Sequence, residues 1–389
     1  MKLSTQCVQL GRGDDTHGAI VPPIYQTATF EQPTATEFGE YDYSRSGNPT
    51  RTILEAQLAA LENAAHARVF SSGMAALTAL TRILKAGEEI IAGDDLYGGT
   101  VRLLDRIASH QNISVRYVDT TDMDQLKNAL TSRTRLILIE TPSNPLFRIS
   151  DIRTLASVAR DAGSFLAVDN SMLSPVFQQP LTLGADIVVH SATKFLCGHS
   201  DVTAGALITN NPTLHQQIAF QQNAEGAGLS PFESWLLLRG LKTLAVRVER
   251  QNASAQKIAR FLKTRAGVTQ VFYPGLEDHP GREIHNKQAS GNGAVISFTT
   301  GDEKLSAQIV ETTRLFKIAV SFGSVGSTIS LPCRMSHASI PSALRDRLAP
   351  PRDLVRLSVG IEDVDDLILD LERAFAINSR EEELAETVQ

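Results

Sequence analysis

Between residue 51 and about residue 210, short apolar segments alternate with helical patterns, and this alternation restricts the fold more than any other feature. The apolar segments cover residues 68–70, 89–92, 115–118, 136–139, 165–168 and 186–189. Helical patterns lie between them, for example over residues 72–85 and 152–162, with Gly87 and Gly163 placed to end them. This order predicts a mostly parallel sheet with helices on both faces, which binds ligands at the carboxyl ends of its strands.

The segments on either side of this region have other patterns. Residues 1–50 are rich in Pro, Thr, Gly and Tyr and show little periodicity, so we expect an arm. Ser230 and Glu233 form a capping box that opens a long helical region reaching toward Gly267. Strand patterns follow over residues 294–298, 318–322 and 355–359. We therefore expect an N-terminal arm (1–50), a large ligand-binding domain (51–245) and a smaller C-terminal α/β domain (246–389).

Composition excludes several classes of function. A net charge of −6 argues against nucleic-acid binding, and no apolar run reaches the roughly 18 residues of a membrane helix. The first residues do not form a secretory signal, and the three scattered cysteines suit a reducing compartment. We expect a cytoplasmic protein without a metal site, in which Cys197 is a buried filler and not a nucleophile.

Lys194 has an unusual position for a lysine, since it follows an apolar strand pattern that ends at His190. Most lysines lie on solvated surfaces, which is the ordinary alternative here. A desolvated lysine loses proton affinity and becomes a nucleophile toward aldehydes. Ser191 and Thr193 place two hydroxyl groups beside it, where they are able to hold a phosphate.

Two other strand ends carry candidate ligand groups. Asp169 ends an apolar strand, where it can pair with a protonated pyridine nitrogen or simply cap a turn. Gly73 and Met74 follow another strand and open a helix, which is either an ordinary helix start or an anion site. Outside the alternating region, Tyr43 and Arg45 suit phosphate binding, and the arm that carries them is able to serve another subunit.

Seven short motifs occur in order along the chain, at residues 43–50, 72–74, 95–99, 140–145, 168–170, 191–194 and 356–360. Together they resemble the Cys/Met-metabolism family of pyridoxal 5'-phosphate (PLP) enzymes over essentially the whole chain. The resemblance implies the PLP-dependent transferase fold of the aspartate aminotransferase type (fold type I), with a mostly parallel central sheet and a smaller C-terminal α/β domain. It also implies PLP as the cofactor.

The resemblance further implies roles for single residues. Lys194 would hold PLP as a Schiff base and move the Cα proton of the substrate, Asp169 would pair with the pyridine nitrogen, and Tyr97 would stack on the ring. Tyr97 would also accept a proton from the substrate amine. Phosphate binding would fall to Gly73, Met74, Ser191 and Thr193.

For the substrate, the resemblance implies that Arg356 binds the α-carboxylate with Ser321 and Asn144 nearby. Tyr43 and Arg45 would reach the phosphate of a neighbouring subunit. The resemblance therefore implies a homotetramer built from two catalytic dimers.

Within the family, two positions bear on which carbon–sulfur bond is cleaved. Val320 occupies a position where the cystathionine γ-synthase and γ-lyase branch commonly has glutamate, and Gly98-Gly99 replaces a cysteine usual in methionine γ-lyases. The stretches similar to cystathionine β-lyases of the plant and Gram-positive bacterial type are residues 24–30, 222–229, 318–325 and 331–341. Gly326 departs from the plant pattern, which has lysine there, and leaves side-chain selectivity open.

The sequence thus predicts a PLP-dependent carbon–sulfur β-lyase of methionine biosynthesis and transsulfuration. It would cleave cystathionine to homocysteine, pyruvate and ammonia. A cystathionine γ-lyase, a methionine γ-lyase or a broader cysteine-S-conjugate lyase is the enzymatic alternative, and a regulatory PLP-binding paralogue without turnover is the non-enzymatic one. The preference among cystathionine, cystine and other thioethers stays open.

Overall fold

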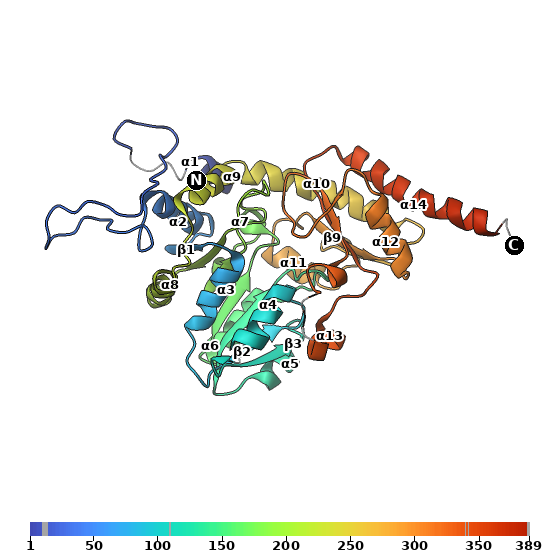
Figure 1. Cartoon of the computed structure of the whole chain (residues 1–389). Coiled ribbons are helices and arrows are strands. Elements are labelled where there is room, and N and C mark those ends of the chain that lie inside the picture. Colours follow the sequence, from blue (N-terminus) through green and yellow to red (C-terminus); the bar gives the residue numbers. More distant parts are fainter. Residues whose placement is uncertain (10–14, 109, 339, 341, 387–389) are drawn as a thin grey trace.

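The computed structural model describes residues 1–9, 15–108, 110–338, 340 and 342–386, and its strands form two sheets (Figure 1). The larger sheet has seven strands in the order β1-β7-β6-β5-β4-β2-β3. Their bounds are His66–Phe70 (β1), Glu89–Gly93 (β2), Ser114–Val118 (β3), Thr134–Glu140 (β4), Phe165–Asp169 (β5), Ile187–His190 (β6) and Gly205–Thr209 (β7). Only β7 runs antiparallel to its neighbours, so the predicted mostly parallel sheet is confirmed. Strand β7 itself was not predicted.

Helices cover both faces of the large sheet. On β4, Leu136 and Leu138 pack into the apolar cluster that includes α3, whereas Ile137 and Ile139 pack into the cluster that includes α6. This alternation is why β4 is apolar at nearly every position. The helices and short turns around this sheet are α2 (Pro49–Leu61), α3 (Gly73–Arg82), α4 (Gly98–Leu103), η1 (Leu104–Ala108), α5 (Met123–Ala129), α6 (Ile152–Asp161), α7 (Ser174–Phe177), η2 (Pro180–Leu183) and α8 (Pro212–Glu225).

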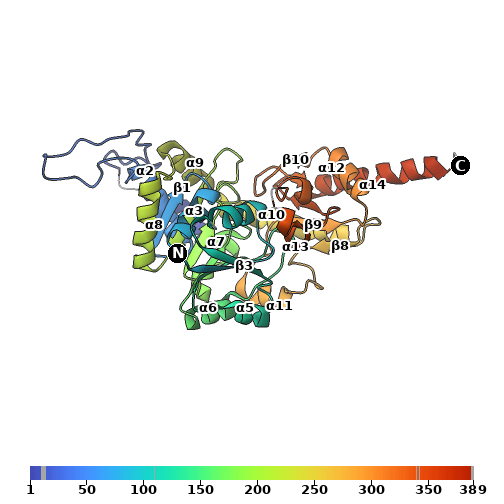
Figure 2. The ribbon, with the colours of Figure 1, turned by 60° about the horizontal axis from the view of Figure 1, so that its bottom comes forward.

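The N-terminal segment is only partly an extended arm. It begins with helix α1 (Leu3–Gln9), in which Cys7 is buried and accepts a hydrogen bond at its backbone oxygen from Gln57 Nε2 over 3.1 Å. After α1, the blue segment before α2 projects away from the body of the molecule in both views (Figures 1 and 2). Within the described ranges, no helix is long and apolar enough to span a membrane.

Ser230 is confirmed as the N-cap of the helix that begins at Pro231, and the Glu233 carboxylate contacts the Ser230 hydroxyl. Ser230 Oγ accepts the backbone N–H of Glu233 over 3.3 Å and lies 3.0 Å from its side-chain Oε2. The helical region it opens is two helices and not one, since α9 (Pro231–Leu241) ends before Thr243 and α10 (Leu244–Lys263) begins after it. Figure 1 shows α10 running from the large-sheet side toward the small sheet.

The smaller sheet follows α10 and has the order β10-β11-β12-β9-β8. Its strands are β8 (Gln270–Phe272), β9 (Val295–Thr299), β10 (Lys317–Ile318), β11 (Thr328–Ser330) and β12 (Val355–Ser358), accompanied by α11 (Arg282–Gln288), α12 (Glu303–Thr312), η3 (Pro332–Arg334), α13 (Ser342–Leu348) and α14 (Val364–Glu386). The expected strand over 318–322 is wrong beyond Ile318, because Ser321 takes a left-handed φ of 80°. The three-part division into 1–50, 51–245 and 246–389 stays a prediction.

Candidate active site

A cavity of about 430 Å³ lies at the carboxyl ends of the large-sheet strands and is closed by residues of the small-sheet half. Ten of the twelve residues predicted for the site line this cavity. They are Gly73, Met74, Tyr97, Asn144, Asp169, Ser191, Thr193, Lys194, Ser321 and Arg356. The two that do not line it are Tyr43 and Arg45. The edge that the alternating pattern predicted is therefore the edge where these groups meet.

Lys194 follows β6 and points its ammonium group into this cavity. Its Nζ donates a hydrogen bond to Ser321 Oγ over 2.5 Å and lies 5.0 Å from the centre of the Phe322 ring. Desolvation lowers the pKa of Lys194 to about 8, and the nearby charge of Arg356 acts in the same direction. At pH 7 roughly a tenth of the amine is thus unprotonated, against less than about a thousandth for an ordinary lysine, and attack on an aldehyde requires this form.

Two carboxyl groups lie side by side at the ends of β4 and β5, where Glu140 and Asp169 are register partners. Asp169 accepts the backbone N–H of Ser171 over 2.9 Å, and Glu140 accepts that of Tyr97 over 3.2 Å. Desolvation raises both pKa values, and the charges of Asp169 and Asp95 raise that of Glu140 further, well above its ordinary range. We therefore assign the proton of this pair to Glu140 and the negative charge to Asp169.

Glu140 was not predicted as a site residue, although it lines the cavity. The available signal was the one used for Asp169, namely a carboxylate that ends an apolar strand. Phe322 and Ser171 were missed as well. Phe322 was expected inside the strand over 318–322, and Ser171 lies in the loop after β5, where the sequence does not fix the direction of the chain.

The predicted phosphate-binding residues come from two adjacent segments. Helix α3 begins at Gly73, and a Cβ on Gly73 would lie 3.0 Å from Ser191 Cβ, so the helix start approaches the segment after β6 closely. Thr193 Oγ1 is oriented by the backbone of Ala204, to which it donates over 3.1 Å and from which it accepts over 2.9 Å. Backbone N–H groups at the start of α3 and the nearby hydroxyls together suit a phosphate.

Tyr97 lies at the N-terminus of α4, with its ring along one wall of the cavity. A Cβ on Gly99 would collide with this ring, so glycine is required for the tyrosine to take this position. The His337 ring packs edge-on against Tyr97 with centroids 6.3 Å apart, and burial lowers the pKa of His337 to about 4. His337 is therefore neutral at physiological pH.

Arg356 reaches the cavity from β12 of the small sheet and is 2% exposed. Its Nη1 donates to Asn144 Oδ1 over 2.8 Å and its Nη2 donates to the backbone oxygen of Ser321 over 3.0 Å. These two contacts hold the planar guanidinium in one orientation. A buried, oriented guanidinium is suited to binding a carboxylate.

Tyr43 and Arg45 lie away from the cavity of their own chain. Arg45 Nη1 donates to the backbone oxygen and to Oδ1 of Asn223, at 2.9 and 2.7 Å, and its guanidinium lies 5.4 Å from the centre of the Tyr43 ring. Both side chains are therefore positioned together on the arm. Their reach to a neighbouring subunit stays a prediction.

Cys197 behaves as expected for a buried filler. The side chain is 1% exposed, and burial together with the adjacent Asp201 carboxylate raises the pKa of the thiol to about 11. A thiol with this pKa is almost entirely protonated at neutral pH and is a poor nucleophile.

Residues 4–376 match the family model described as "Cys/Met metabolism PLP-dependent enzyme". The chain belongs to this family. Within the family, the chain is 53% identical over 373 residues to the chloroplastic cystathionine beta-lyase of Arabidopsis thaliana, covering 96% of this chain and 80% of the plant protein. It is 45% identical over 375 residues to the cystathionine gamma-lyase of Bacillus subtilis (strain 168), covering 96% and 99%.

A solved structure of a family member agrees with the fold. The cystathionine gamma-lyase of Lactobacillus plantarum complexed with L-serine superposes with a TM-score of 0.94 and 42% identity, covering 97% of this chain and 99% of that one. The predicted α/β fold is confirmed.

The cavity residues fit the cofactor that this family uses. A lysine with a lowered pKa suits the aldehyde, a carboxyl at the end of β5 suits the pyridine nitrogen, and the α3 N-terminus suits the phosphate. The prediction of PLP as cofactor is confirmed by the family.

Proposed function

We propose that this chain is a PLP-dependent carbon–sulfur lyase that cleaves L-cystathionine at the Cβ–S bond, giving homocysteine, pyruvate and ammonia. The observation that carries the proposal is the pairing of Lys194 with Arg356 in one cavity. The lysine is a base and nucleophile at neutral pH, and the arginine is a preoriented carboxylate ligand. Together they place the Cα proton of an α-amino acid next to the lysine.

In this proposal Lys194 holds PLP covalently, Asp169 binds its pyridine nitrogen, and Tyr97 stacks on its ring. The phosphate contacts come from Gly73, Met74, Ser191 and Thr193. When bound, PLP supplies an electron sink that stabilises negative charge at Cα of the substrate. The Asp169 carboxylate would keep the ring nitrogen protonated, and the protonated ring accepts electrons better.

Arg356 binds the substrate carboxylate, with Asn144 and Ser321 fixing the guanidinium. Tyr97 accepts the proton of the substrate ammonium, which frees its amine. Lys194 Nζ then removes the Cα proton and delivers a proton to the sulfur of the leaving homocysteine. The three-carbon remainder is released, and water hydrolyses it to pyruvate and ammonia.

A γ-lyase is the second candidate, because the chain is also 45% identical to the Bacillus subtilis cystathionine gamma-lyase. The two activities release different keto acids from cystathionine, pyruvate in β-elimination and 2-oxobutyrate in γ-elimination. Steady-state turnover of L-cystathionine with chromatographic identification of the keto acid therefore tests the proposal. Mainly 2-oxobutyrate would assign the chain to the γ-lyases.

We also propose that the enzyme is a homotetramer of two catalytic dimers in the cytoplasm. The positions of Tyr43 and Arg45 support a shared site, since both lie on the projecting arm and outside their own cavity (Figure 1). The free thiols of Cys7, Cys197 and Cys333 support a reducing compartment. Light scattering of the purified holoenzyme tests the assembly.

A further inference from the structure

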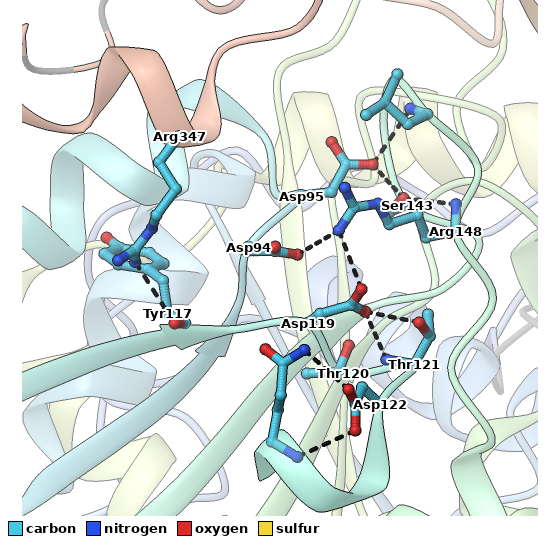
Figure 3. A network of polar contacts seen from close by, with 12 residues as sticks. Asp94, Asp95, Tyr117, Asp119, Thr120, Thr121, Asp122, Ser143, Arg148 and Arg347 are labelled. Atoms are coloured by element: carbon cyan, nitrogen blue, oxygen red, sulfur yellow. Dashed lines mark hydrogen bonds and ion pairs between the residues drawn. The ribbon is translucent and has the colours of Figure 1, made fainter. Parts of the chain in front are cut away.

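A buried polar contact joins two loops that each carry a cavity residue (Figure 3). Asp95 lies in the loop after β2, and Ser143 lies in the loop after β4. Ser143 Oγ donates a short hydrogen bond to Asp95 Oδ2, and the same carboxylate oxygen accepts the backbone N–H of Leu146 over 3.2 Å. Asp95 is 8% and Ser143 3% exposed, so water does not compete for this contact.

The neighbours of these two residues in the chain line the cavity. Tyr97 is two residues beyond Asp95, and Asn144 directly follows Ser143. Asn144 in turn accepts the hydrogen bond from Arg356 Nη1. A shift of one loop against the other would therefore move Tyr97 relative to the carboxylate-binding guanidinium.

Arg148 contacts Ser143 and the neighbouring residue Asp94, and so adds to the polar network around the Asp95–Ser143 hydrogen bond (Figure 3). Its backbone N–H donates to Ser143 Oγ over 2.8 Å, and its guanidinium Nη1 lies 2.8 Å from Asp94 Oδ1 and 3.6 Å from Asp119 Oδ2. Burial raises the pKa of Asp95 to about 6. The hydrogen bond from Ser143 and the positive charge of Arg148 act in the opposite direction and favour the carboxylate form. At neutral pH the carboxylate predominates and accepts both hydrogen bonds.

We infer that Asp95 is a positioning residue for the substrate carboxylate: through Ser143 it fixes Asn144, and through Asn144 it holds Arg356 in its binding orientation. This inference rests on the proposed role of Arg356. It assigns Asp95 no contact with the substrate. The loss of the contact should accordingly weaken substrate binding more than it impairs the later steps.

The test measures binding of L-alanine to the holoenzyme by the change in the visible absorption band of the bound cofactor. L-Alanine has the α-amino and α-carboxylate groups but no leaving group, so the result does not depend on which carbon–sulfur bond is cleaved. Failure of the proposed function would appear instead in the keto acid released from cystathionine. The two outcomes are thus separable.

The variants are Asp95→Asn, Ser143→Ala and their combination, with Asp94→Asn as the matched control. The Asp94 side chain accepts a hydrogen bond from Arg148 Nη1 over 2.8 Å, and among the described residues it makes no hydrogen bond to Ser143. We expect Asp95→Asn and Ser143→Ala each to weaken alanine binding about tenfold, equivalent to one lost hydrogen bond to a charged group. Asp94→Asn should stay within about twofold of wild type.

A double-mutant cycle separates positioning through one contact from general loosening of the fold. If the contact is the cause, the double variant binds alanine about as weakly as either single variant. Equal affinity of wild type and Ser143→Ala, or fully additive losses, would overturn the inference. Ser143→Ala removes one hydroxyl and creates no new charge, so it carries the test even if Asp95→Asn fails to fold.

Discussion

Lys194 Nζ donates a hydrogen bond to Ser321 Oγ over 2.5 Å, and this contact joins the two halves of the molecule. Lys194 follows β6 of the large sheet, whereas Ser321 lies between β10 and β11 of the small one. The backbone oxygen of Ser321 accepts a hydrogen bond from Arg356 as well. One serine thus sets the distance between the proposed base and the proposed carboxylate ligand.

Replacement of Lys194 tests the central assignment. We expect Lys194→Ala to lose the covalently bound cofactor and to lower turnover of cystathionine by at least about a thousandfold, because nucleophile and base are removed together. Lys257 is an exposed lysine on α10 and provides the control. Lys257→Ala should leave both cofactor attachment and cystathionine turnover unchanged. The protein is treated with borohydride, which reduces the Schiff base to a stable amine, and is then dialysed under denaturing conditions. The near-ultraviolet absorbance of the pyridoxyl group that it retains measures the covalent bond. Substantial turnover by Lys194→Ala would refute the assignment.

The lowered pKa of Lys194 predicts the pH dependence of cofactor capture by the apoprotein. The amine attacks an aldehyde only when it is unprotonated, so capture should be slow below the pKa and fast above it. The rate should rise to half of its plateau near pH of about 8, whereas a lysine with the ordinary value of 10.5 would still be rising at that pH. Stopped-flow absorbance after mixing apoprotein with PLP measures this rate. A capture rate that is still rising at a pH of about 10, with no plateau, would contradict the lowered pKa.

The carboxyl edge of the sheet was predictable because it follows from local patterns. Lys194 and Gly73 each follow an apolar strand and Asp169 ends one, and the alternation of strands with helices makes these strands parallel. Their meeting in one cavity is then a consequence of topology. Arg356 lies on the other sheet, and only the family resemblance brought it to the site.

The missed features depend on contacts between distant parts of the chain. Ser321 was expected in a strand, but its left-handed φ of 80° turns the chain so that its hydroxyl meets Lys194. The link between Asp95 and Ser143 joins residues 48 positions apart. A periodic pattern in the sequence does not predict such a contact, because the contact forms only when the sheet brings the two loops together.

The protonated form that we assign to Glu140 predicts different effects for two amide substitutions. Glutamine resembles a neutral carboxyl group, so Glu140→Gln should keep the cofactor and change turnover by no more than about threefold. Asp169→Asn removes a negative charge beside the ring nitrogen and should lower turnover by roughly a hundredfold or more. Cofactor content and kcat for both variants check this contrast. Equal losses would mean that Glu140 is ionised.

Subunit mixing tests the shared site. Arg45→Ala and Lys194→Ala homomers should each be inactive, because one lacks the phosphate contact and the other the base. After exchange at equal amounts, half of the dimers are mixed and each has one intact site, so activity should return to about a quarter of the wild-type value. Native mass spectrometry verifies the exchange. No recovery in verified mixed dimers would exclude a site shared through Arg45.

Val320 bears on the choice between the two carbon–sulfur bonds. It lines the cavity and is 58% exposed, so a longer side chain can be accommodated at this position without disturbing the core. Valine offers no carboxylate to bind the distal amino group of cystathionine in the orientation that γ-cleavage needs. One or two missing polar contacts are worth about 1–3 kcal/mol, or roughly 10–100-fold in rate.

We therefore expect the wild type to release more pyruvate than 2-oxobutyrate from L-cystathionine, and Val320→Glu to raise the share of 2-oxobutyrate. Glutamine has nearly the same size as glutamate but no charge. Val320→Gln therefore separates a steric effect from binding of the ammonium group. If glutamine shifts the products as much as glutamate does, the carboxylate is not the cause. Because the negative charge acts on an exposed cation, the shift caused by glutamate should diminish as salt is added. A shift that is insensitive to salt would point to a change in cavity shape.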